Sequence, residues 1–212
     1  MFIVDEKYQD KIRKRYKLAS KFYFLADLIL SGVRKKIAEF IELGPGAKVL
    51  DIAAGTGKQA SAFAKLGLNI IGIDISEHML RLTARYAKYR NTYFCVSDAA
   101  RLPIKDESVD GCCISFALHE IPPKETVKIL SEMFRVTKQG GKVIVADYSL
   151  PKNPIAKFLA YNIIKLVEGK SYAQFIKLNM SCILSQLGIK VNREHSLFFG
   201  IGKITVGLNL KE

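Results

Sequence analysis

The most constraining feature of the chain is a strand-and-turn segment at residues 48–58, Lys-Val-Leu-Asp-Ile-Ala-Ala-Gly-Thr-Gly-Lys. An apolar run leads into an acid, Asp51, and a turn of small residues follows. Residues 70–74, Ile-Ile-Gly-Ile-Asp, repeat this plan and end at Asp74. Small residues let a bulky ligand approach the backbone closely, and an acid at the tip of the second strand can accept both hydroxyls of a ribose. The two segments therefore predict a site for a nucleoside cofactor.

The turn is compatible with more than one cofactor. Residues 55–60 fit the dinucleotide fingerprint G-x-G-x-x-G/A, and Asp74 lies near the spacing of its ribose acid. A phosphate-binding loop is excluded, because Gln59 stands where Ser or Thr is required and Ile52 stands at the first glycine. Asp51 favours S-adenosylmethionine (SAM), since a carboxylate before the turn would repel a pyrophosphate but can hold an ammonium group, directly or through water.

These residues resemble motif I of the class I SAM-dependent methyltransferases, Asp-x-Gly-x-Gly-x-Gly, with Ala53 in place of the first glycine. The resemblance covers residues 45–150 and extends more loosely to a helix that carries Tyr16 and to residues 172–189. The stretches from Asp98 to Pro103, from Asp106 to Asp110 and from Leu130 to Asp147 are most similar to the ubiquinone/menaquinone-biosynthesis C-methyltransferases and their relatives, the methyltransferase type 11 group. Quinone enzymes usually carry an Arg-Asn pair where this chain has Leu118-His119-Glu120.

The hydrophobic pattern predicts one globular α/β domain. Most candidate strands are continuous apolar runs, as in a parallel sheet that is buried on both faces. The predicted strands span residues 48–53, 69–74, 92–97, 109–116 and 141–147, with an antiparallel hairpin at 189–199 and 201–210. The predicted helices span residues 57–66, 76–88 and 124–137. In the last of these, Val127, Leu130, Met133 or Phe134, and Thr137 share one face, and Gly140-Gly141 end the helix.

These elements predict a Rossmann-like, doubly wound, seven-stranded sheet that is mostly parallel, with a C-terminal antiparallel hairpin. We expect an N-terminal helical cap segment at residues 1–43 and a SAM-binding domain at residues 44–212. A lid insertion is expected at about residues 152–187.

The cofactor site is expected at the carboxyl edge of the sheet, where ligands of such folds bind. Asp98 and the Ala99 amide match motif II of the family, which would bind adenine, although a helix N-cap or loop acid is an alternative for Asp98. Ile75 and Met79 would flank the adenine, with core packing as the alternative for Met79. The predicted cofactor-binding residues are Asp51, Ala53, Gly55, Gly57, Asp74, Ile75, Met79, Asp98, Ala99 and Phe116.

His119 is the candidate catalytic base, because it follows the fourth predicted strand and titrates near neutral pH. A hydrogen-bonded scaffold role explains His119 equally well. Tyr16, Tyr148 and Tyr172, together with His119, are the candidate substrate pocket. Nucleic acid is not expected as substrate, because the segment after this strand has no Asn/Asp/Ser-Pro-Pro-aromatic motif that would grip a flipped base. No Cys-x-x-Cys spacing indicates a metal site.

The chain carries 33 Lys and Arg against 20 Asp and Glu, a formal net charge of +13. Much of the excess lies in residues 151–212. Residues 155–167 mix apolar side chains with lysines, which is typical of a lid helix over an apolar substrate or of a helix on an anionic membrane surface. A solvated lysine-rich face is an equal alternative. The absence of a long apolar run or a secretion signal, with four unpatterned cysteines, favours the cytoplasm. The oligomeric state is not indicated.

We therefore expect a SAM-dependent methyltransferase that acts on a small, hydrophobic or anionic acceptor, either quinone- or phenol-like or lipid-like. A SAM-binding regulatory protein without catalysis and an NAD(P)-dependent oxidoreductase remain as alternatives.

Overall fold

The computed structural model describes residues 30–83, 89 and 91–211 of the chain. The chain divides into two compact units, residues 1–36 and 37–212, and the second contains the whole sheet. Residues 30–40 are helical. Tyr16 and most of the proposed N-terminal cap segment lie outside the described residues.

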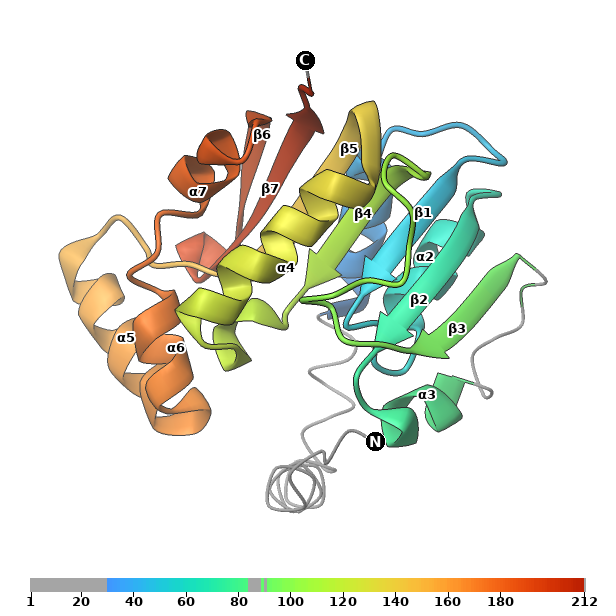
Figure 1. Ribbon diagram of the computed structural model, residues 1–212. Coiled ribbons are helices and arrows are strands. Elements are labelled where there is room, and N and C mark those ends of the chain that lie inside the picture. Colours follow the sequence, from blue (N-terminus) through green and yellow to red (C-terminus); the bar gives the residue numbers. More distant parts are fainter. Residues whose placement is uncertain (1–29, 84–88, 90, 212) are drawn as a thin grey trace. The chain divides into compact units, whose positions relative to one another are not determined.

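A seven-stranded sheet in the order β3-β2-β1-β4-β5-β7-β6 organises the second unit (Figure 1). Parallel pairing joins the first five strands, whereas β7 is antiparallel to both β5 and β6. The predicted mostly parallel sheet with a C-terminal hairpin is therefore confirmed. The strands are β1 (Lys48–Ile52), β2 (Asn69–Asp74), β3 (Thr92–Val96), β4 (Val109–Ser115), β5 (Thr137–Tyr148), β6 (Ile189–Leu197) and β7 (Gly202–Asn209).

Helices cover both faces of the sheet, with α4 on one face and α2 on the other (Figure 1). The α-helices are α2 (Lys58–Ala64), α3 (Glu77–Thr83), α4 (Pro123–Val136), α5 (Pro154–Glu168), α6 (Lys170–Phe175) and α7 (Met180–Gln186). Two short 3₁₀ helices are η1 (Leu118–Glu120) and η2 (Phe198–Gly200). Among the described residues, none of the helices combines the length and the apolar character that a membrane span requires.

The helix predicted at residues 124–137 agrees with α4 to within one residue at each end, but the prediction that Gly140-Gly141 end it is wrong. α4 ends at Val136, the backbone of Thr137 is already extended, and β5 begins at that residue. Gly140 and Gly141 lie inside β5, where the pairing with β4 jumps from Val109–Thr137 to Gly111–Lys142. A Cβ on Gly141 would lie 2.5 Å from Cγ2 of Thr137. The glycines therefore form a bulge within the strand instead of terminating the helix.

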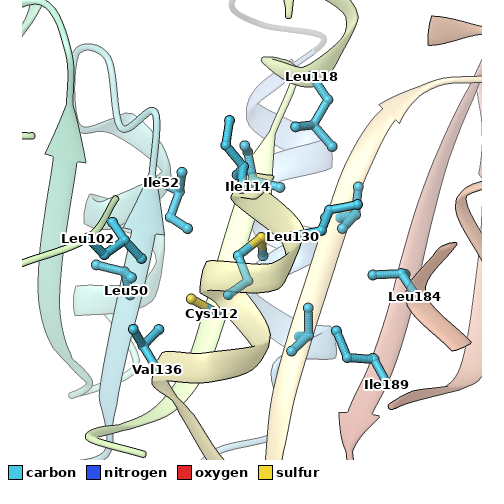
Figure 2. Packing of buried hydrophobic residues seen from close by; sticks show 14 of the residues in the cluster. Leu50, Ile52, Leu102, Cys112, Ile114, Leu118, Leu130, Val136, Leu184 and Ile189 are labelled. Carbon is cyan, nitrogen blue, oxygen red and sulfur yellow. The ribbon is translucent and has the colours of Figure 1, made fainter. Parts of the chain in front are cut away.

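The predicted apolar face of α4 is also partly wrong. Val127 is 41% exposed, and the buried face consists of Thr126, Ile129, Leu130, Met133 and Val136. This face contributes Ile129, Leu130, Met133 and Val136 to the main hydrophobic cluster, which also contains Leu50 and Ile52 of β1 and Cys112 and Ile114 of β4 (Figure 2). The cluster fixes the sheet relative to α4 and so positions the loops at the carboxyl ends of the strands.

Three helices, α5, α6 and α7, occupy the chain between β5 and β6. α5 packs against α6, and α6 packs against η1, which directly follows β4. Figure 1 shows α5 and α6 beyond the carboxyl ends of the central strands. This segment therefore borders the edge at which the sequence places the site.

Candidate active site

The turn after β1 has the left-handed backbone that small residues permit. Ala53, Gly55 and Gly57 have φ angles of 54°, 54° and 75°. The Ala54 amide donates to the Ile73 carbonyl at 2.8 Å, which ties the turn to β2. An alanine at such an angle is strained, because its Cβ crowds the following carbonyl. Ala53, which stands in place of the first motif glycine, therefore keeps the left-handed backbone that a glycine would adopt there.

Asp74, at the end of β2, joins the turn to the next loop. Its Oδ2 accepts a hydrogen bond from the Gly55 amide and its Oδ1 accepts one from the Ser76 amide, each at 2.8 Å. Burial raises the pKa of the Asp74 carboxyl, although these amide hydrogen bonds favour the ionised form. Because each carboxylate oxygen has two lone pairs, both oxygens retain capacity to accept a ligand hydroxyl.

A cavity of about 290 Å³ opens beside Asp74, and we call it the Asp74 cavity. Five of the predicted cofactor-binding residues line it: Ala53, Asp74, Ile75, Asp98 and Ala99. Met79 lies over the turn, since its Cε is 3.6 Å from the point where a Cβ on Gly55 would be. Residues from β1, β2 and the loop after β3 therefore converge as the sequence predicts.

Asp98 is an exposed loop acid whose Oδ1 accepts a hydrogen bond from the Ala100 amide at 2.9 Å. The following loop is fastened to α4. The Leu102 amide donates to Glu132 at 2.6 Å, and Arg135 donates to the Ile104 carbonyl at 2.8 Å and to Asp106 at 2.6 Å. These hydrogen bonds position the loop that carries Asp98 along one wall of the Asp74 cavity.

Three of the predicted cofactor-binding residues lie elsewhere. Asp51 is 1% exposed and lies within β1, beneath the turn. Gly57 is packed tightly, because a Cβ there would lie 2.9 Å from Cζ of Phe94. Phe116 has a φ of 51° and its ring lies 6.1 Å from that of Tyr148, so it borders the second group of site residues described next.

His119 lies at the centre of that group, the His119 cluster, formed by His119, Asp147, Tyr148, Glu168 and Tyr172. Its Nδ1 is 2.7 Å from Oδ1 of Asp147, and its Nε2 is 3.8 Å from Oε2 of Glu168. Tyr148 packs edge-on against the imidazole at 4.7 Å and donates a hydrogen bond to Glu168 at 3.3 Å. Elements far apart in the chain, η1, β5 and the end of α5, supply these side chains.

Opposing effects set the protonation of the His119 cluster. Burial alone would lower the pKa of His119, but the hydrogen bond with Asp147 and the nearby carboxylates of Asp147, Glu168 and Glu120 raise it overall. Burial and the carboxylates of Glu168 and Asp147 raise the pKa of Tyr148, and burial raises the pKa of Tyr172 to about 12. Both phenols are therefore neutral at physiological pH, and His119 is a stronger base than a free imidazole.

Tyr172 closes the His119 cluster from α6. It is fully buried, and its ring lies 5.5 Å from that of Tyr148. Within the described part of the chain, its hydroxyl has no hydrogen-bond partner. His119, Tyr148 and Tyr172, predicted as a pocket from scattered positions, thus lie together, and Ile121 and Pro122 lead from this cluster to the Asp74 cavity.

Residues 49–141 match the family model of the methyltransferase domain. The chain is 40% identical over 118 residues to demethylmenaquinone methyltransferase of Renibacterium salmoninarum, covering 56% of this chain and 48% of that protein. It is 34% identical over 155 residues to the protein of the same name from Paenarthrobacter aurescens, covering 71% of this chain and 60% of that protein. The match thus spans about half to three fifths of the length of these relatives.

Solved structures share the fold of this chain. A SAM-dependent methyltransferase from Aquifex aeolicus gives a TM-score of 0.65 at 20% identity, covering 84% of this chain and 89% of that one. Phosphoethanolamine N-methyltransferase 2 of Haemonchus contortus, in complex with SAM, gives a TM-score of 0.68 at 16% identity. This match covers 85% of this chain and 53% of that one. At these identities the likeness concerns the fold.

Sequence reasoning missed several residues of the Asp74 cavity and the His119 cluster. Ile121, Pro122, Glu125 and Ile129 line the Asp74 cavity from the start of α4. Asp147 and Glu168 were missed as partners of His119. Asp147 ends a buried apolar strand, as Asp51 and Asp74 do, and this position was the available signal.

The His119 cluster also brings together groups that bind metals elsewhere. His119, Glu120 and Glu168 each offer an atom within 4.8 Å of the others. However, Nε2 and Glu168 stand at ion-pair distance, and the raised pKa favours the imidazolium that would neutralise the carboxylates. We therefore interpret His119 and Glu168 as an ion pair.

Proposed function

We propose that the chain is a SAM-dependent methyltransferase that methylates a small apolar acceptor of the quinone or phenol type. The Asp74 cavity supports this proposal most directly, because it combines the small-residue turn with three carboxylates, Asp74, Asp98 and Glu125. Among the described residues, no lysine or arginine lines it. Such a lining suits a cationic nucleoside with hydroxyl groups and disfavours the pyrophosphate of a dinucleotide.

In this proposal, Asp74 accepts hydrogen bonds from the ribose hydroxyls, and Asp98 with the Ala99 amide binds the adenine edge. Ile75, which is 50% exposed at the cavity, provides an apolar surface for the adenine ring. Asp51 provides negative charge beneath the turn for the ammonium group of SAM. Because its carboxylate is buried, this contact would run through a water molecule. The cofactor supplies a methyl group on a positively charged sulfur.

We propose His119 as the base that takes a proton from the acceptor. Asp147 accepts from Nδ1–H, which leaves Nε2 as the basic nitrogen. His119 is 6% exposed, and α6 packs against the η1 helix that carries it. An acceptor would therefore reach Nε2 when the segment at residues 152–187 moves away, and we assign this segment the role of lid. A scaffold role for His119 predicts instead that its replacement leaves turnover intact.

The nature of the acceptor rests on the relatives and on the His119 cluster. The relatives are named demethylmenaquinone methyltransferase, and the rings of Phe116, Tyr148 and Tyr172 provide aromatic surface beside the proposed base. Flat aromatic acceptors pack well against such rings. We propose a cytoplasmic location, because all four cysteines are free, and we do not expect nucleic acid as a partner.

The test is transfer of labelled methyl from SAM to a demethylated naphthoquinone with a short prenyl tail. We expect labelled product from the wild-type chain, and strongly reduced product from His119→Gln with unchanged SAM affinity. SAM binding without transfer to quinone, phenol or lipid acceptors would favour a regulatory SAM-binding protein.

A further inference from the structure

α5 exposes an unusual number of large apolar side chains. Leu166 is 88% exposed, and Ile155 and Phe158 are 72% and 69% exposed. The exposed apolar side chains of the helix are Ile155, Phe158, Leu159, Ile163, Leu166 and Val167. Leaving so much apolar surface in water is unfavourable, and contiguous surfaces of this kind mark interaction sites.

These side chains lie on the side of α5 that faces away from the protein. The inward side carries Ala160, which is buried, Tyr161, which packs against Tyr172, and Glu168, which faces His119. At 100° per residue, five of the six exposed apolar residues fall on the opposite half of the helix, whereas Val167 lies next to Ala160 at its border. A surface helix of a globular protein normally turns its apolar side inward, so the polarity of α5 is reversed.

The same apolar surface continues on a second element. Phe199 in η2 is fully exposed and has a φ of 55°, a conformation that is strained for an aromatic residue. It lines one hollow together with Asn153, which caps α5, and Ala156 in the first turn of α5. We call the six exposed apolar residues of α5, with Phe199, the α5 face.

Positive charge surrounds the α5 face. Residues 151–170 contain four lysines, Lys152, Lys157, Lys165 and Lys170, and one acid, Glu168. All four lysines are exposed, whereas Glu168 is directed to the His119 cluster. The surroundings of the α5 face are therefore basic.

We propose that the α5 face docks on the surface of a bilayer that contains anionic lipids. The apolar side chains would enter the boundary between headgroups and acyl chains, and the lysines would contact the anionic headgroups, as in interfacial helices. A second copy of the chain is a poorer partner, because a two-fold contact through this face would bring lysines of both copies together. The inference depends on the surface alone and not on the identity of the methyl acceptor.

The experiment is flotation of the full chain with vesicles of phosphatidylcholine, with and without phosphatidylglycerol. We expect binding to the anionic vesicles that weakens as salt is raised, and little binding to the neutral ones. Leu166→Gln should weaken binding about tenfold, because an exposed leucine that enters an apolar phase is replaced by a polar side chain. Phe199→Asn should weaken it too, and asparagine accepts the left-handed backbone at this position.

Leu66→Gln is the matched control, since Leu66 is an exposed leucine at the end of α2, outside the α5 face. It should bind vesicles like the wild type, and all three variants should bind SAM like the wild type. The proposal is overturned if the wild type does not bind anionic vesicles, or if Leu66→Gln weakens binding as much as Leu166→Gln. A dimer that Leu166→Gln dissociates, seen by sedimentation in the absence of vesicle binding, would assign the face to a second copy instead.

Discussion

Nδ1 of His119 lies 2.7 Å from Oδ1 of Asp147, and Oδ2 of the same carboxylate accepts a hydrogen bond from the His119 amide at 3.3 Å. Asp147 therefore holds both the ring and the backbone of His119, from the end of a strand 28 residues away in sequence. This arrangement fixes the tautomer and leaves Nε2 towards Glu168. It gives His119 the orientation and basicity that a base requires.

Replacing Asp147 with Asn should lower the pKa of His119, because the ring loses its main charged partner. With His119 as the proposed base, turnover requires the neutral ring, so the rise of turnover with pH should move to lower pH. The maximum rate should fall about tenfold or more as the ring loses its fixed tautomer. NMR titration of the ring and a pH–rate profile measure both effects. An unchanged His119 pKa in this variant would contradict the assigned contact.

Replacing His119 with Gln should change the pH dependence of stability in a defined direction. The folded-state pKa of His119 is raised above its unfolded value of about 6.5. Its protonation therefore stabilises the fold below that value, and this contribution is lost as the pH rises through the folded-state pKa. The difference in unfolding free energy between wild type and His119→Gln should shrink as the pH rises, as followed by urea denaturation. A difference in unfolding free energy that grows with pH would contradict a raised pKa of His119 in the folded protein.

Replacing Asp74 with Asn should weaken SAM binding by about 1–3 kcal/mol, the cost of a lost charge-assisted hydrogen bond. The amide retains one acceptor oxygen, so the contact with either Gly55 or Ser76 can persist. Calorimetry measures the affinity. Asp110→Asn is the control, because Asp110 bonds to the Lys48 amide and to Lys138 and does not line the Asp74 cavity.

Replacing Arg135 with Met should destabilise the fold by about 2–3 kcal/mol, since several charge-assisted hydrogen bonds are lost together. Arg135 joins Glu132 and Asp106 and supports the carbonyls of Leu102 and Ile104. Chemical denaturation measures the loss. Lys128→Met is the matched control on the same helix, with an exposed ion pair to Glu125, and should cost less than about 1 kcal/mol.

The parts of the site that sequence patterns could predict are local in the chain. The segment around Asp51 and the acid at Asp74 belong to buried apolar strands, whereas the loop at Asp98 follows the largely exposed edge strand β3. Parallel strands bring all three to one edge of the sheet. The same reasoning placed His119 beyond β4. The mostly parallel sheet followed from the alternation of strands and helices, and the C-terminal hairpin from two adjacent strand-like segments; the order of the strands was not predicted.

The remaining features depend on long-range packing. The burial of Thr126 instead of Val127 depends on how α4 rotates on the sheet. The bulge at Gly140-Gly141 depends on the pairing of β4 with β5, because a glycine pair is equally typical of a helix end. Glu168 reaches His119 only because α5 and α6 fold back over η1.

The central claim is that the Asp74 cavity binds SAM, and calorimetric titration of the purified chain with SAM, S-adenosylhomocysteine and NADH tests it most directly. We predict binding of the first two ligands, loss of affinity for both in Asp74→Asn, and no binding of NADH. Binding of NADH, or of none of the three, would contradict the account of Asp51, Asp74 and Asp98 as a site for a cationic nucleoside.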